Sequence, residues 1–82
     1  MAINYEQLIA DLIKPLVMNP EDVMVKKFSE ENEVLTIQVI VNQDDLGRVI
    51  GKNGRIANAI RTIAYASASK EGKKVQINID SL

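Results

Sequence analysis

The sequence contains no cysteine and no histidine among its 82 residues. Without cysteine, the chain can form neither a disulfide framework nor a thiolate metal site. Histidine is the most common general base and cysteine the best nucleophile, so their absence argues against catalysis. The acidic residues also lie in predicted loops and helix starts, not as a pair of carboxyl groups in an apolar setting. We therefore expect no catalytic residue, no metal and no cofactor.

Long apolar runs are absent as well. No stretch approaches the length of a membrane-spanning helix, and the N-terminus lacks the basic-then-apolar pattern of a signal peptide. Apolar residues make up 46% of the chain, which is enough for a small core of marginal stability. We expect residues 1–82 to form a single domain in the cytoplasm.

The charge of the chain is divided unevenly along its length. The net charge is −1, which by itself argues against a nucleic-acid-binding protein. Residues 1–45, however, hold three Lys and nine Asp or Glu, a net charge of −6, whereas residues 46–82 hold seven Lys or Arg and two acids, a net charge of +5. The second part therefore suits a phosphate backbone, although an uneven surface charge without a ligand is the alternative.

Apolar periodicity predicts six elements in the order helix, strand, strand, helix, helix, strand. Asn4 is placed to cap the first helix, and Pro15 should distort its end. Residues 19–22 read as a turn, and residues 29–33 as an acidic hairpin connection. The predicted elements are a helix at 4–17, strands at 23–28 and 34–41, helices at 46–50 and 55–69, and a strand at 75–80.

The strands alternate between apolar and polar residues, most clearly at 75–80. The helices should therefore cover one face of a three-stranded sheet and leave the polar face in water, which is an α+β fold. We expect the long helix to bury Ile56, Ile60, Ile63 and Ala64.

A Gly-x-x-Gly motif, Gly51-Lys52-Asn53-Gly54, lies between the two central helices. Free backbone N–H groups and the positive dipole end at the start of the following helix suit an anion such as a phosphate. Glycine also lets the backbone of a ligand come close. Four cations accompany the motif, and residues 46–70 contain no acid; these cations are Arg48, Lys52, Arg55 and Arg61.

The motif alone has little specificity, because about 0.4 matches are expected by chance when glycine makes up ~7% of residues. It also comes near a nucleotide-binding P-loop beginning at Gly47, but it is one residue short and has Asn53 in place of Ser or Thr. A purely structural corner between two helices is a further alternative.

In its context, the segment from Val49 to Ile56 resembles the Ile-Gly-x-x-Gly-x-x-Ile signature of KH domains, although Ile56 falls one place early. The element order, α-β-β-α-α-β, is similar to that of the type II, bacterial KH fold. The size and pattern resemble the YlqC group of small bacterial KH-domain RNA-binding proteins, and the resemblance covers essentially the whole chain.

The resemblance implies a groove for about four nucleotides of single-stranded RNA beside the Gly-x-x-Gly loop. It places the clamp at Gly51–Gly54, with Ile50 and Ile56 beneath it, while Arg48 and Arg55 are the nearest cations. It further implies a small RNA chaperone or post-transcriptional regulator. Such a protein would be a homodimer, or would pair with a larger KH-containing protein (KhpB, also called Jag or EloR), in control of cell elongation and division.

A second hypothesis is a protein-interaction subunit whose nucleic-acid binding is weak or vestigial. Small residues allow two helices to approach closely, although alanine is also common in helices for its propensity alone. The candidate dimer face comprises Ala57, Arg61, Ala64, Tyr65 and Ala68. Aromatic residues are scarce, so base stacking should contribute little and RNA binding should be weak with low sequence preference.

Overall fold

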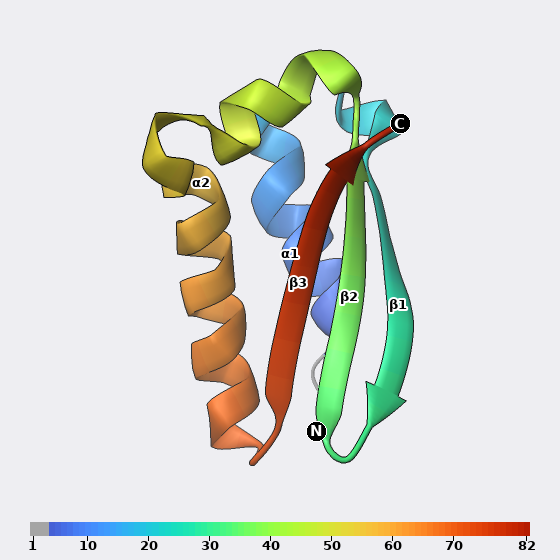
Figure 1. Ribbon diagram of the computed structural model, residues 1–82, viewed down its shortest axis with the longest axis vertical. Coiled ribbons are helices and arrows are strands. Elements are labelled where there is room, and N and C mark those ends of the chain that lie inside the picture. Colours follow the sequence, from blue (N-terminus) through green and yellow to red (C-terminus); the bar gives the residue numbers. More distant parts are fainter. Residues whose placement is uncertain (1–3) are drawn as a thin grey trace.

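A computed structural model describes residues 4–82, except for the side chains of Lys52 and Asn53. Two helices and two short 3-10 turns pack with a three-stranded sheet (Figure 1). The elements are α1 (Tyr5–Ile13), η1 (Lys14–Leu16), η2 (Pro20–Asp22), β1 (Met24–Glu31), β2 (Val34–Val41), α2 (Gln43–Lys70) and β3 (Lys74–Ser81).

The first helix begins as predicted and ends earlier. The Asn4 side chain caps α1 by accepting a hydrogen bond from the backbone N–H of Gln7 at 3.0 Å. The helix ends at Ile13, and Pro15 lies in the 3-10 turn that follows. Leu16 is therefore exposed instead of lying on the buried face with Ile9 and Ile13.

The hairpin between β1 and β2 is tighter than predicted. β1 continues to Glu31, so the connection is the two residues Asn32 and Glu33, whose φ angles are 52° and 66°. Positive φ at both central residues is typical of the two-residue turns that join antiparallel strands. The prediction of a connection at 29–33 was wrong because the end of β1 is polar and solvent-exposed, which hides its strand character.

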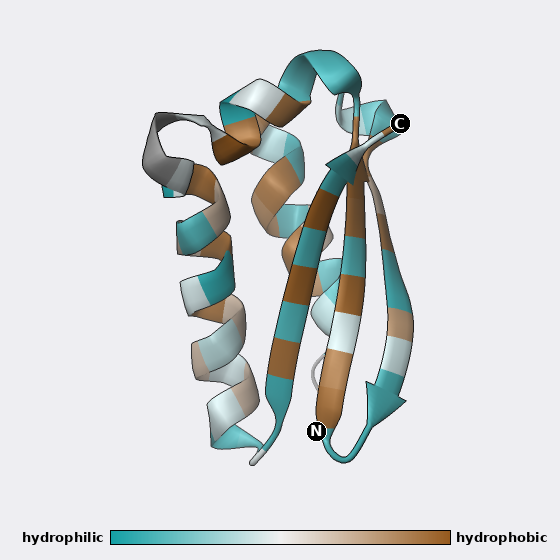
Figure 2. Cartoon of the chain, viewed as in Figure 1, coloured by the Kyte–Doolittle hydropathy of each residue, from teal (hydrophilic) through white to brown (hydrophobic). Residues whose placement is uncertain are grey.

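The sheet has the order β1-β2-β3, with β1 antiparallel and β3 parallel to β2. β2 is the central strand, and its alternate residues are buried (Leu35, Ile37, Val39 and Val41). Figure 2 shows the same apolar-polar alternation on β2 and β3. Both helices contribute to the core beneath this face, which confirms the expected α+β, type II KH arrangement.

The two predicted central helices form one element, α2, whose limbs run in different directions before Gly51 and after Gly54 (Figure 1). Gly54 has a φ of +68°, which a right-handed helix does not adopt. Val49 of the first limb is fully buried, and the second limb buries Ala57, Ile60, Ala64 and Ala68. The prediction that Ile63 is buried was wrong: it is 43% exposed, because the alanines occupy the inner face and let α2 lie close to the sheet.

Candidate nucleic-acid interface

The Gly51–Gly54 segment forms a corner in α2, and its two glycines differ in what they contribute. Gly54 adopts the left-handed conformation, so a side chain there would be strained. A Cβ at Gly51 would meet nothing within 4 Å, so glycine at this position leaves open space for an incoming group. The predicted contacts of the Lys52 and Asn53 side chains lie outside the described residues.

The two isoleucines beside the corner do not lie together beneath it. Ile56 is half-buried and packs against the core. Ile50 is 47% exposed, so it contributes an apolar surface next to the corner instead of a support under it. This corrects the expectation for Ile50, and it leaves one apolar side chain available to a ligand.

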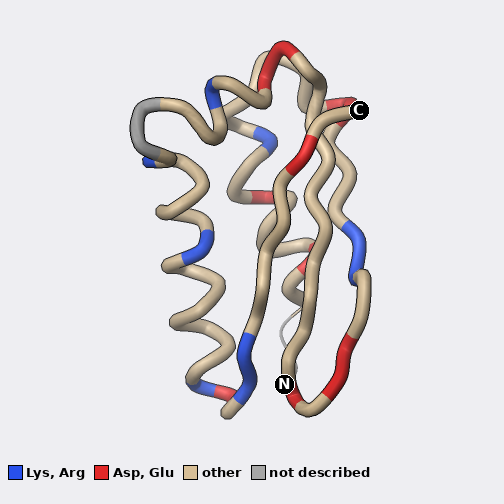
Figure 3. The backbone as a smooth tube through the Cα atoms, in the orientation of Figure 1, with Lys and Arg blue, Asp and Glu red and all other residues tan. Residues whose placement is uncertain are grey.

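The basic residues of the second part of the chain lie mainly along one element. Figure 3 shows Lys and Arg spaced along α2 and at the beginning of β3, whereas acids lie at the start of α2, directly after its end, near the end of β3 and on the hairpin. Arg48 and Arg55, on the two sides of the corner, are both exposed. The limbs of α2 on both sides of the corner therefore carry positive charge that suits an anion.

Arg61 joins the second limb of α2 to the edge of the sheet. Its Nη2 donates a hydrogen bond to the main-chain oxygen of Ile77 at 3.4 Å. Arg61 is half-buried, so it is not part of an ordinary solvated helix face. Neither its partner nor its orientation was predicted from the sequence.

The same hydrogen bond shows which backbone groups of β3 point away from β2 and toward α2. β3 pairs only with β2 in this sheet, and successive residues of a strand direct their backbone groups to opposite sides. Because the Ile77 oxygen faces α2, the backbone groups of Val75 and Ile79 are directed to that side too. The edge of β3 thus presents main-chain donors and acceptors to the space beside α2.

A buried carboxylate holds the first limb of α2 in place. Asp45 accepts hydrogen bonds from the backbone N–H groups of Met18 (2.9 Å) and Asn19 (3.0 Å) and from Asn19 Nδ2 (3.1 Å). The Met18 hydrogen bond, with those from Asn19 and the nearby Arg48, lowers the pKa of Asp45 despite its burial. The sequence indicates Asp45 only as an acid at a helix start, because its partners lie 26 and 27 residues away.

The candidate dimer face is largely internal. Ala57, Ala64 and Ala68 are at most 1% exposed, because they follow the buried stripe that contains Ile60. These three alanines therefore cannot meet a partner, which corrects the prediction. Arg61 is half-buried, and Tyr65, at 45% exposure, is the most accessible member of the set. The outward line of the same helix is instead formed by Ala59, Ile63 and Ala66, all exposed.

Two further features are missing from the described part of the chain. No cluster of acidic side chains suited to a metal ion occurs in residues 4–82 outside the two undescribed side chains. In the same residues, neither helix carries an apolar stretch long enough to cross a membrane.

Comparison with known proteins finds a similar protein that is named RNA-binding, a matching KH-domain family model and two structures of the same fold. The RNA-binding protein KhpA of Listeria monocytogenes serovar 1/2a is 50% identical over 74 residues, covering 90% of this chain and 96% of the relative. Two solved structures share the fold. One is Aquifex aeolicus Era bound to GDP and aluminium fluoride (TM-score 0.72, 16% identity, 95% of this chain and 30% of that chain).

The other is Era in complex with MgGDPNP and nucleotides 1506–1542 of 16S ribosomal RNA (TM-score 0.69, 17% identity, 94% of this chain and 29% of that chain). A family model for the KH domain of KhpA and KhpB matches residues 6–79. This family is non-enzymatic, in agreement with the sequence. The chain belongs to the KhpA/KhpB KH-domain family.

Proposed function

We propose that this protein is a non-catalytic, single-stranded RNA-binding protein that grips the RNA backbone at the Gly51-Lys52-Asn53-Gly54 corner. The observation that carries the proposal is the position of this corner. It is a glycine-bounded bend between two exposed arginines, and it opens the limb of α2 that runs along β3 (Figure 1). The KhpA relative is named an RNA-binding protein, and one Era structure contains ribosomal RNA. Both support RNA as the ligand.

The proposed contacts divide between phosphates and bases. Backbone N–H groups near Gly54, together with Arg48 and Arg55, meet the phosphates. Ile50 supplies an apolar surface for a base or ribose, and the outward backbone groups of β3 meet base edges. Only unstacked bases can reach a strand edge, so single strands are preferred to duplexes.

Weak binding with little sequence preference suits an RNA chaperone or post-transcriptional regulator acting in the cytoplasm. A second RNA-binding unit would raise the affinity by avidity. A family model that spans both KhpA and KhpB supports a larger KhpB-type protein, also called Jag or EloR, as that partner. Through this pair the protein would act in the control of cell elongation and division.

The double substitution Lys52→Asp and Asn53→Asp tests the proposal. It should abolish binding of a fluorescent oligouridylate in an anisotropy titration while leaving the circular dichroism spectrum unchanged. Lys27→Asp with Asn32→Asp is the matched control, because it makes the same two chemical changes at exposed positions on β1 and the hairpin. The proposal fails when the corner variant binds as well as the control.

Self-association is a second candidate function, and the exposure of Ile63 favours it. We place the interface on the line of Ala59, Ile63 and Ala66, where small residues flank one exposed branched side chain. Ile63→Arg should convert a dimer to a monomer in light scattering. Ala64→Arg is unsuitable for this test, because Ala64 is fully buried and its replacement would disrupt the core.

A further inference from the structure

A hollow lies at the C-terminal end of the second limb of α2, away from the corner. This open hollow has a volume of about 700 Å³ and lies between the last turns of α2 and the beginning of β3. Tyr65 lies eleven residues after Gly54, about 17 Å along a helix that rises ~1.5 Å per residue. The residues that line the hollow are Val34, Tyr65, Ser69, Gly72, Lys73, Lys74, Val75 and Gln76. This hollow is separate from the clamp described above.

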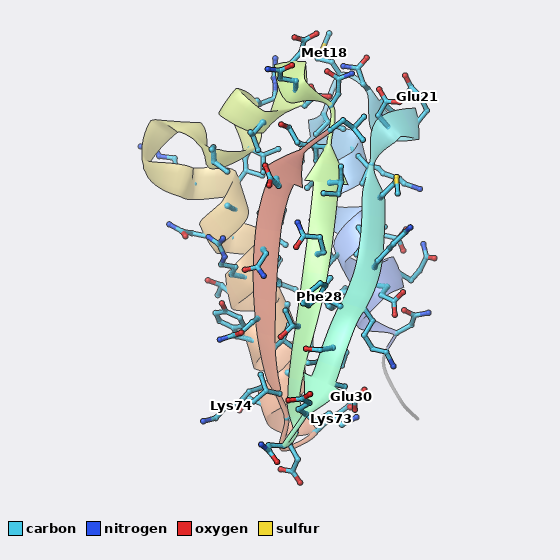
Figure 4. The ribbon with its side chains drawn as sticks, turned by 45° about the vertical axis from the view of Figure 1, so that its right-hand side comes forward. Met18, Glu21, Phe28, Glu30, Lys73 and Lys74 are labelled. Carbon is cyan, nitrogen blue, oxygen red and sulfur yellow. The ribbon has the colours of Figure 1, made fainter. Side chains whose placement is uncertain are left out.

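The lining combines one aromatic ring with two ammonium groups. Tyr65 is 45% exposed, so a face of its ring is available for stacking. Lys74 is exposed at the lower end of β3 (Figure 4). Lys73 is half-buried, with Nζ 4.0 Å from a carboxylate oxygen of Glu71. An aromatic ring beside cations is the composition of single-strand binding sites, where stacking on the ring accepts any base.

The hollow and the corner lie along one side of the molecule. Arg61 is four residues before Tyr65, so the two side chains are neighbours on the same helix face. Arg61 reaches Ile77 of β3, and Gln76 of β3 lines the hollow. Arg48, Arg55, Arg61 and Lys74 therefore mark a basic path that follows α2 and reaches the beginning of β3. Figure 3 shows Lys and Arg spaced in this way along α2 and at the start of β3.

We propose that the hollow binds a further nucleotide of the same RNA strand, with its base stacked on Tyr65 and its phosphate at Lys74. The inference rests on the proposed function and extends it. A stacked strand rises ~3.4 Å per nucleotide and an unstacked strand advances further, so a separation of about 17 Å holds at most about five nucleotides. A clamp for about four nucleotides thereby becomes a footprint of up to about nine.

Binding of four-nucleotide and ten-nucleotide oligouridylates to the full chain tests this footprint. The ten-nucleotide strand should bind at least tenfold more tightly than the four-nucleotide strand. Tyr65→Ala should weaken binding of the longer strand about fivefold or more, the range that ~1–3 kcal/mol of stacking gives, and leave the shorter strand unaffected. Phe28→Ala is the matched control, because Phe28 is 75% exposed on β1, away from the path.

A spectroscopic readout separates stacking from an indirect effect. The chain has two tyrosines and no tryptophan, and Tyr5 is buried. In protein labelled with 3-fluorotyrosine, the ten-nucleotide strand should shift the fluorine signal of Tyr65 and leave that of Tyr5 in place. Tyr5→Phe assigns the two signals.

The two proposals fail in different ways. If both strands bind and Tyr65→Ala changes neither affinity, the second site is wrong and the clamp stands. The second site is also wrong, and the clamp stands, if Tyr65→Ala changes only the molecular mass measured by light scattering. The hollow would then be a contact between two protein chains. If neither strand binds at low salt, both proposals are wrong.

Discussion

The guanidinium of Arg61 lies 3.4 Å from the main-chain oxygen of Ile77, so one side chain spans the boundary between α2 and the edge of β3. This contact places a positive charge midway between the corner and the hollow that contains Tyr65. A guanidinium carries five N–H donors, and this hydrogen bond uses one of them. A strand running along the path would pass this group.

Replacing Arg61 should therefore weaken RNA binding more than it weakens the fold. Arg61→Gln should lower the slope of log affinity against log salt by about one, the loss of one phosphate contact. Its effect on the free energy of unfolding should be at most about 1.5 kcal/mol, since one long hydrogen bond is lost. Arg61→Lys should retain the salt slope, because it keeps the charge. An unchanged slope in Arg61→Gln would show that no phosphate lies there.

Replacing two glycines of α2 with alanine should change the stability of the fold in opposite directions. Gly54→Ala should destabilise the fold by about 1–2 kcal/mol, because its φ is +68°. Gly47→Ala should stabilise it by up to about 1 kcal/mol, because Gly47 lies in helix with nothing within 4 Å of the added Cβ. Urea denaturation measures both. Equal effects would mean that the corner is an ordinary helical turn.

The anchoring carboxylate predicts an acid dependence. In the folded chain the pKa of Asp45 lies below its ordinary value of 3.8. The unfolded chain therefore takes up the proton first, and the stability due to Asp45 is complete above that value and is lost as the pH falls through the folded pKa. Asp45→Asn should lower the melting temperature by several degrees at pH 7, with the difference shrinking toward pH 3.

Asp44→Asn is the control for this measurement, because it removes an equal charge from an exposed neighbour at the same helix start. It should leave the melting temperature nearly unchanged at both pH values. A deficit for Asp45→Asn that stays constant between pH 7 and pH 3 would contradict the assigned role of the carboxylate.

The hairpin offers a stabilising substitution. Glu33 has a φ of 66° in a two-residue turn after Asn32, where Asn-Gly is the preferred pair. Glu33→Gly should raise the free energy of unfolding by about 1 kcal/mol, because glycine adopts positive φ without steric cost. Glu31→Gly, in β1, should lower it. Thermal unfolding of the two variants shows whether each substitution raises or lowers the stability of the fold.

Elements with a strong alternating pattern were predicted nearly to the residue. β2 matches the predicted 34–41, and β3 is longer than the predicted 75–80 by one residue at each end. The end of β1 was missed because an edge strand need not bury Glu30 or Glu31. The inner face of α2 was misplaced because isoleucine is a stronger apolar signal than alanine, whereas close packing against the sheet favours the smaller residue.

The candidate RNA-binding site also combines features that are local in the sequence with contacts between distant segments. The Gly51–Gly54 motif and its flanking arginines are local in sequence and could be predicted from it. The contacts of Arg61 with Ile77, and of Asp45 with Met18 and Asn19, join segments 16 to 27 residues apart. They depend on how α2 packs against β3 and against the segment between η1 and η2, so no local pattern predicts them.

The most direct test of the account is nuclear magnetic resonance of the 15N-labelled protein titrated with a ten-nucleotide oligouridylate at low salt. The backbone amide signals of residues 51–56 and of Val75, Ile77 and Ile79 should shift together, while those of β1 stay in place. Shifts confined to β1 and the hairpin, or no shifts at all, would contradict the proposal that RNA lies along the corner and the edge of β3.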